Sequence, residues 1–291
     1  MNPLSRTWCN AALDRALPRS PRTAPLLRAI GACAVVLALC AASGARADSL
    51  DDTLSLSLGT FLLTTDTTLR VDGNGIEGTP FNLEHVLGYS EQTSFRLDAY
   101  WRFFKRHKIR IMYFDEGRGS TRTIDREIVF DGFTYPVNAE ISSRYDTLVA
   151  EVAYEYAFLR GEHYELAASV GVHDITFKVS LAAVANNLNL TDSRRADANG
   201  PLPVAGLHYL WQFTPKLNLD AMVELFQLKV DQFDGNLQEY NASIVYMPWK
   251  SFGIGAGWNA FVSHVNVDQN SFSGNLYWRY SGLRVYARFS Y

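Results

Sequence analysis

The sequence predicts an all-β protein whose strands close into a single antiparallel barrel. Segments in which apolar and polar residues alternate with a period of two recur along the chain after residue 47. Short connections between these segments alternate with long polar ones. No stretch after residue 47 approaches the length of an apolar membrane-spanning helix, so any insertion of this region into a membrane requires a closed barrel.

Residues 1–47 have the layout of a secretory signal peptide. Arg15, Arg19, Arg22 and Arg28 precede an uncharged run from Ala29 to Gly44, and Ala45-Arg46-Ala47 supplies a small-x-small cleavage site. Leu37-Ala38-Leu39-Cys40 leaves a lipoprotein signal open, although Leu39 stands where a small residue is normally expected. We therefore predict a signal peptide over residues 1–47 and one barrel domain over residues 48–291.

Cleavage after Ala47 would leave 244 residues with a distinct composition. It removes all three cysteines, six arginines and one acidic residue, which takes the net charge from −3 to −8. Disulfide bonds and cysteine-ligated metals are then excluded. The acidic balance also argues against nucleic acid as a partner.

The alternating segments place an apolar face against a polar one. In residues 94–104, Phe95, Leu97 and Ala99 share the apolar face, opposite Arg96 and Asp98. Residues 148–158 and 217–225 show the same pattern, and runs at 164–172, 204–213, 240–247 and 252–262 repeat it. The glycines between Gly253 and Gly257 are predicted to face the lumen and to leave room for a bulky neighbour opposite.

The connections fall into two classes. Short turns are predicted at 105–107, 160–163, 214–216 and 249–251, and aromatic residues flank them. The long polar connections lie around 64–92, 118–143 and 183–202. Four short turns imply about ten strands, with eight or twelve left open. Ten strands require 271–291 to form one strand, with a bulge near Ser281-Gly282, because Leu276 and Leu283 lie on opposite parities.

The last segment, 282–291, places Leu283, Val285, Ala287, Phe289 and Tyr291 on one face. It resembles the C-terminal signal by which Gram-negative outer-membrane β-barrels are recognised for assembly, with Gly282, Val285, Phe289 and Tyr291 as the signal residues. The resemblance is to the class and not to any one family. It implies the bacterial outer membrane as the location, periplasmic turns, long extracellular loops, and lipid, lipopolysaccharide and the barrel assembly machinery as partners.

If the apolar face meets lipid, the polar face lines the lumen. Basic residues gather in the first and last strands and acidic residues in the middle strands. Closing the barrel would therefore place them on opposite walls, either paired across a plugged interior or apart across an aqueous path. The predicted luminal charge network is Arg96, Asp98, Arg102, Lys108, Arg110, Glu151, Glu155, Glu165, His173, His208, Asp220, Glu224, Arg284 and Arg288.

One constellation could carry chemistry. His173 and His208 would point inward from neighbouring strands, with Ser169 on the same face as His173 and with Asp174 and Glu165 nearby. We interpret the histidines as hydrogen-bonded members of the luminal network, and we predict no catalytic residue, metal or cofactor. The expected function is that of an outer-membrane protein that is either structural or passes small solutes through a narrow, porin-like channel. The alternatives are a lipid- or surface-modifying enzyme and a surface-binding protein that acts through its loops.

Overall fold

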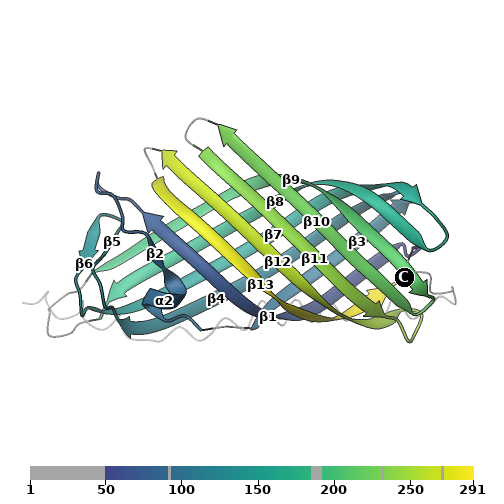
Figure 1. The fold of residues 1–291 in the computed structure, drawn as a ribbon, viewed down its shortest axis with the longest axis horizontal. Coiled ribbons are helices and arrows are strands. Elements are labelled where there is room, and N and C mark those ends of the chain that lie inside the picture. The colour runs from purple at the N-terminus through teal and green to yellow at the C-terminus, as the bar shows by residue number, and fades with distance from the viewer. Residues whose placement is uncertain (1–49, 91–92, 185–191, 231–232, 270–271) are drawn as a thin grey trace, which may run out of the picture. The chain divides into compact units, whose positions relative to one another are not determined.

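A computed structural model describes residues 50–90, 93–184, 192–230, 233–269 and 272–291. Ten antiparallel strands form a closed barrel (Figure 1), because the last strand pairs with the first. They are β1 (Leu54–Val71), β3 (Thr93–Phe104), β4 (His107–Thr123), β7 (Glu140–Arg160), β8 (Tyr164–Ala183), β9 (Ser193–Thr214), β10 (Leu217–Val230), β11 (Phe233–Tyr246), β12 (Phe252–Gln269) and β13 (Phe272–Ser290). The predicted fold class and the count of ten strands are confirmed.

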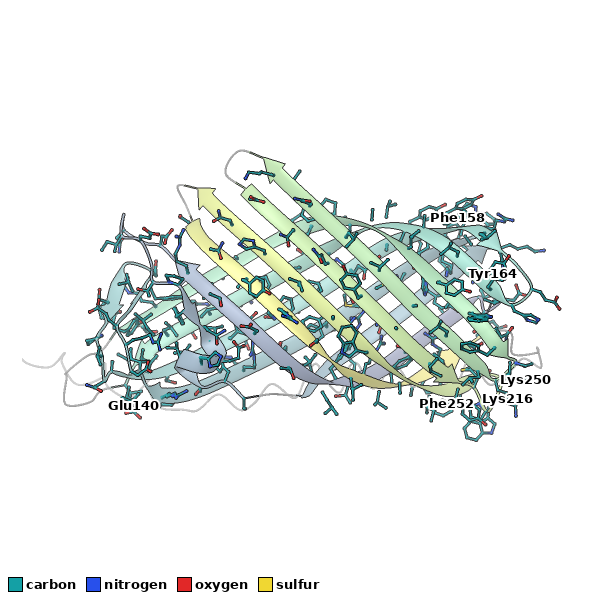
Figure 2. All side chains as sticks on the ribbon, viewed as in Figure 1. Glu140, Phe158, Tyr164, Lys216, Lys250 and Phe252 are labelled. Carbon is teal, nitrogen blue, oxygen red and sulfur yellow. The ribbon has the colours of Figure 1, made fainter. Side chains whose placement is uncertain are left out.

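Four short connections meet at one end, which we call the turn end. They join β3 to β4, β7 to β8, β9 to β10 and β11 to β12. Aromatic residues flank these turns, and Figure 2 shows Phe158, Tyr164 and Phe252 at this end, with Glu140 at the opposite one. Exposed rings at one level are typical of the girdle at a membrane interface.

The opposite end, the loop end, carries the remaining connections. The strands extend further into the predicted loops than the sequence indicated, since β1 runs to Val71 and β9 begins at Ser193. The β1–β3 connection contains a two-residue strand, β2 (Phe81–Asn82), and a short helix, α2 (Leu83–Leu87). The β4–β7 connection forms a small hairpin, β5 (Ile128–Phe130) with β6 (Phe133–Tyr135). No helix in the described part of the chain is long and apolar enough to cross a membrane.

The predicted bulge near Ser281-Gly282 is wrong. β13 keeps one uninterrupted register with β1 and with β12. Leu276, Trp278 and Tyr280 are buried inside the barrel on the same parity as Arg284, whereas Leu283 is exposed on the outer face. The apolar side of the strand changes from the inner to the outer face because the loop-end half of the lumen is apolar and the turn-end half is charged.

Gly255 of β12 faces the lumen and leaves room for a bulky neighbour, as predicted. This residue pairs with Tyr286 of β13, and a Cβ at position 255 would collide with the tyrosine ring. Tyr286 is buried and packs with Val245 and Met247. A side chain larger than hydrogen at position 255 would therefore displace this ring from the lumen.

Candidate functional site: the filled lumen

The luminal charges come from inward-facing positions of strands on opposite walls. β3, β4 and β13 supply the arginines and Lys108, and β7, β8, β10 and β11 supply most of the carboxylates. All fourteen residues of the predicted network take part in ion pairs. These pairs fill the turn-end half of the barrel.

Lys108 and Arg110 are the centre of this network. The Lys108 ammonium lies 2.9 Å from both Glu155 and Glu165. The Arg110 guanidinium lies 2.8 Å from Glu151 and 2.9 Å from Glu155, and it also contacts Glu224. Since all of these side chains are buried, each charge depends on its partners and not on water for its stabilisation.

Near the turn end, the same arrangement continues around the barrel. Arg102 lies 2.8 Å from Glu165, and Arg288 lies 2.6 Å from Asp220. His208 stands between two carboxylates, with its Nδ1 3.0 Å from Glu155 and its Nε2 3.0 Å from Asp220. These ion pairs therefore connect β3, β4 and β13 to β7, β8 and β10 across the interior of the barrel.

His173 occupies a second cluster, deeper in the lumen. Its Nε2 lies 3.2 Å from Glu151, 3.7 Å from Glu239 and 3.8 Å from Glu224. Glu239, which is not among the residues predicted from the sequence, also pairs with Arg96 at 2.8 Å and accepts a hydrogen bond from Asn259. Glu239 lies one position before the alternating run at 240–247, and its parity opposite the exposed Tyr240 could have placed it in the lumen.

This cluster has the geometry to hold a cation. One ligand atom each of Glu151, His173 and Glu224 lies within 4.8 Å of the others, and all three side chains are buried. A protonated imidazole or a divalent metal ion would satisfy the same converging oxygens. Glu224 is also held on its other oxygen by Arg110 and by the Ser169 hydroxyl, which donates to it at 3.1 Å.

The Ser169–His173 constellation does not form a nucleophile and base pair. The Ser169 hydroxyl donates to Glu224, and His173 faces the three carboxylates. Asp174 is exposed on the outer face of β8, opposite His173. A catalytic serine needs its base within hydrogen-bond reach, and that contact is not present here.

An aromatic cluster fills the lumen on the loop-end side of the charges, and it was not predicted from the sequence. Phe61, Phe114, Phe261, Trp278 and Tyr280 are all buried there. The rings of Phe261 and Tyr280 stack with centroids 5.2 Å apart, and those of Phe114 and Tyr280 stack at 5.4 Å. His173 meets this cluster edge-on at Phe261, so the charged and aromatic layers are in direct contact.

Arg118 attaches the β1–β3 connection to the inside of the barrel. Its guanidinium lies 2.5 Å from Glu84 of α2, donates to the Thr67 hydroxyl and stands 4.8 Å from the Tyr145 ring centroid. Leu83, Val86 and Leu87 of the same helix are buried in the apolar cluster. The connection therefore folds over the loop end and covers part of it.

The four residues of the predicted assembly signal lie in β13 and at the C-terminus. Val285 and Tyr291 are about half exposed on the outer face. Gly282 allows close approach of β1, since a Cβ there would collide with the Leu62 carbonyl oxygen. The backbone oxygen of Tyr291 accepts bonds from the N–H groups of Thr53 and Leu54. Recognition of these residues by an assembly machinery stays a prediction.

No protein-family model matches the chain, and no curated protein matches it. Solved structures of outer-membrane proteins do match. The outer membrane protease OmpT of Escherichia coli aligns with 84% of this chain and 98% of its own, at a TM-score of 0.54 and 8% identity. The translocator domain of autotransporter NalP from Neisseria meningitidis aligns with 92% of this chain and 97% of its own (TM-score 0.39, 10% identity). The attachment invasion locus protein Ail of Yersinia pestis aligns with 79% and 97% (TM-score 0.31, 12% identity). The match to OmpT and the closed antiparallel topology together show that this chain has the fold of an outer-membrane β-barrel protein.

Proposed function

We propose that this protein is a structural barrel of the bacterial outer membrane whose lumen is closed to ions and small solutes. The observation that carries the proposal is the filled interior, in which ion pairs join opposite walls and an aromatic cluster lies directly above them. Barrels of about eight strands are filled by side chains, and open channels belong to about sixteen strands or more. The turns face the periplasm, and lipid and lipopolysaccharide contact the outer surface.

The outer surface supports the membrane location. Large apolar side chains are exposed around the whole barrel, including Leu62, Val152, Val170, Ile254 and Leu283. A water-soluble protein rarely leaves so much contiguous apolar surface uncovered. The surface fits the apolar band of a membrane-spanning barrel.

Planar-bilayer recording of the refolded protein tests the closed lumen. A heat-dependent gel shift first establishes that the barrel is closed. We expect no reproducible conductance steps from the native protein. Steps whose ion selectivity changes when Arg96 and Arg102, or Glu151 and Glu155, are neutralised would overturn the proposal in favour of a narrow channel.

The alternatives make different predictions. A lipid- or surface-modifying enzyme would lose a chemical change in the membrane when His173 and Ser169 are replaced in a folded barrel. A surface-binding protein would lose its partner when the loop-end connections are shortened. The hydrogen bond from Ser169 to Glu224 argues against the enzyme, because the Ser169 hydroxyl does not meet His173 as a nucleophile meets its base.

A further inference from the structure

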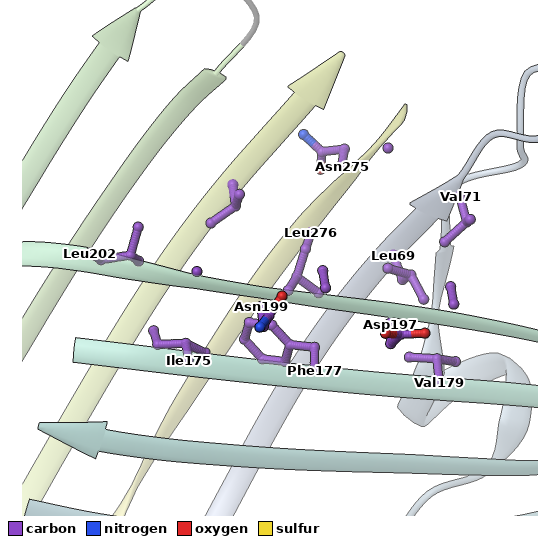
Figure 3. Close-up of a pocket in the computed structure, with 15 residues that line it drawn as sticks. Leu69, Val71, Ile175, Phe177, Val179, Asp197, Asn199, Leu202, Asn275 and Leu276 are labelled. Carbon is purple, nitrogen blue, oxygen red and sulfur yellow. The ribbon is translucent and has the colours of Figure 1, made fainter. Parts of the chain in front are cut away.

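An apolar cavity of about 120 Å³ lies inside the loop-end half of the barrel. Apolar side chains from several strands line it, and Figure 3 shows Leu69 and Val71 of β1, Ile175, Phe177 and Val179 of β8, Leu202 of β9 and Leu276 of β13 around it. Polar groups are few at its wall. Asn275 donates its side-chain N–H to His264, and Asp197 and Asn199 are exposed. Asp197 is the one charged residue among the described residues of the wall and its side chain is exposed, so the cavity offers mainly dispersion contacts.

The barrel wall is interrupted beside this cavity. β9 pairs with β8 from Trp211 to Ser193, which includes its entire loop-end part. It pairs with β10 only as far as Ala205, opposite Leu225. Beyond that point, residues 226–230 of β10 pair with β11 and with no other strand in the part of the chain that the structure describes. The loop end of strand β10 stands apart from the loop ends of β8 and β9 in Figure 1.

Two prolines explain why this part of β9 does not pair with the described residues of β10. The Gln212 N–H donates toward β8, to the His163 carbonyl, so even-numbered residues of β9 face β8 and odd-numbered ones face β10. Pro201 and Pro203 are odd-numbered and have no N–H to donate. Prolines are tolerated at such an edge and disfavoured in a paired strand.

The unpaired edge also borders the cavity. Five consecutive residues, Ala196 to Gly200, line it, although alternate side chains of a strand face opposite sides. The backbone edge of β9 and not only its inner face therefore forms part of the wall. Pro203 lies eight positions from Trp211 at the turn end, about 20 Å along the normal of a strand tilted by about 40°. The interruption thus begins in the outer part of an apolar band about 25 Å tall.

We propose that this cavity binds one small, uncharged apolar molecule, with the gap between the unpaired parts of β9 and β10 as its mouth. The size fits a single aromatic ring, since a dry cavity of about 150 Å³ lined by Leu, Ile and Phe binds benzene. A lipid acyl chain of twelve or more carbons is too large. The opening of the mouth toward the outer leaflet rests on the proposed membrane location, but binding itself does not.

Fluorobenzene, followed by its ¹⁹F signal in a titration of the refolded full-length barrel, tests the proposal. We expect a saturable shift above the partitioning into protein-free micelles. Gly200 offers a clean way to fill the cavity, because a Cβ there meets no atom within 4 Å. Gly200→Leu should weaken binding at least tenfold. Ala198→Leu places a side chain in the same space and should have the same effect, so one variant can replace the other if it fails to fold. Ala205→Leu is the matched control on the outward face of β9 and should bind within twofold of the native protein.

Amide hydrogen exchange locates the mouth. Exchange at the N–H groups of Asp197 and Asn199, which face away from β8, should be fast in the free protein and slower with fluorobenzene bound. A shift that never saturates, native-like binding by both filled variants, or the absence of protection at Asp197 and Asn199 would each overturn the proposal. Conductance recording separates the cavity proposal from the proposed function. A barrel that does not conduct and does not bind fluorobenzene overturns only the cavity site. A barrel that conducts and binds fluorobenzene overturns only the closed lumen.

Discussion

At the scale of single residues, Arg110 is a buried cation on which three buried carboxylates depend. It contacts Glu151, Glu155 and Glu224 at once. Removing one partner of a buried pair leaves an uncompensated charge, which typically costs about 3–5 kcal/mol. We therefore expect Arg110→Met to lower the free energy of unfolding by about that amount, measured by urea unfolding of the barrel in lipid vesicles with tryptophan fluorescence.

Arg144→Met is the control for this measurement. Arg144 pairs with Asp146 on β7, but both side chains are exposed (69% and 37%). Exposed pairs contribute less than about 1 kcal/mol, so this variant should unfold close to the native protein. Equal effects of the two substitutions would mean that the luminal charges are hydrated and do not depend on one another.

At the scale of elements, the helix α2 and the connection around it depend on Arg118 of β4. Glu84 accepts bonds from both the Arg118 side chain and the Thr67 backbone, which fixes the helix to the inner wall. Arg118→Ala should release this connection while the strands remain paired. Limited proteolysis should then cut between residues 72 and 90 in the variant, with the heat-dependent gel shift of the barrel retained.

The matching control is Arg126→Ala, in the connection between β4 and β5. Arg126 is 61% exposed and pairs only locally with Asp125. It should leave the cleavage pattern of the native protein unchanged. Resistance of Arg118→Ala to cleavage would show that the buried apolar side chains of α2 hold the connection without the arginine.

At the scale of the whole molecule, the outer surface should respond to charge according to depth. Val170 on β8 is 59% exposed and lies six positions from Tyr164 at the turn end, near the middle of the expected apolar band. Val170→Arg should destabilise the barrel in vesicles by about 2–4 kcal/mol, and Leu159→Arg, beside the β7–β8 turn, by about 0–1 kcal/mol. Equal costs at both positions in a urea titration would contradict the assigned membrane level.

The sequence predicted the closed barrel because strand alternation and turn spacing are local patterns. It also assigned the inward parity of the luminal charges, including Arg96, Glu151 and Glu224. It could not show which charges meet, since Arg96 and Glu239 lie 143 positions apart in the chain. The aromatic cluster was missed for a different reason. If the whole lumen is assumed to be polar, apolar side chains such as Trp278 and Tyr280 are predicted to face outward.

The pairing of Arg96 with Glu239 has a consequence for how the barrel folds. The two residues approach only when β3 and β11 have both joined the sheet, and the aromatic cluster needs β1 and β13 together. Contacts this distant in sequence slow folding, because the loop entropy is lost before the contacts form. The luminal charges must stay hydrated until the last strand docks, so we expect closure to be the slow step. Once closed, the barrel should open so slowly that its lifetime, and not an equilibrium constant, describes its persistence.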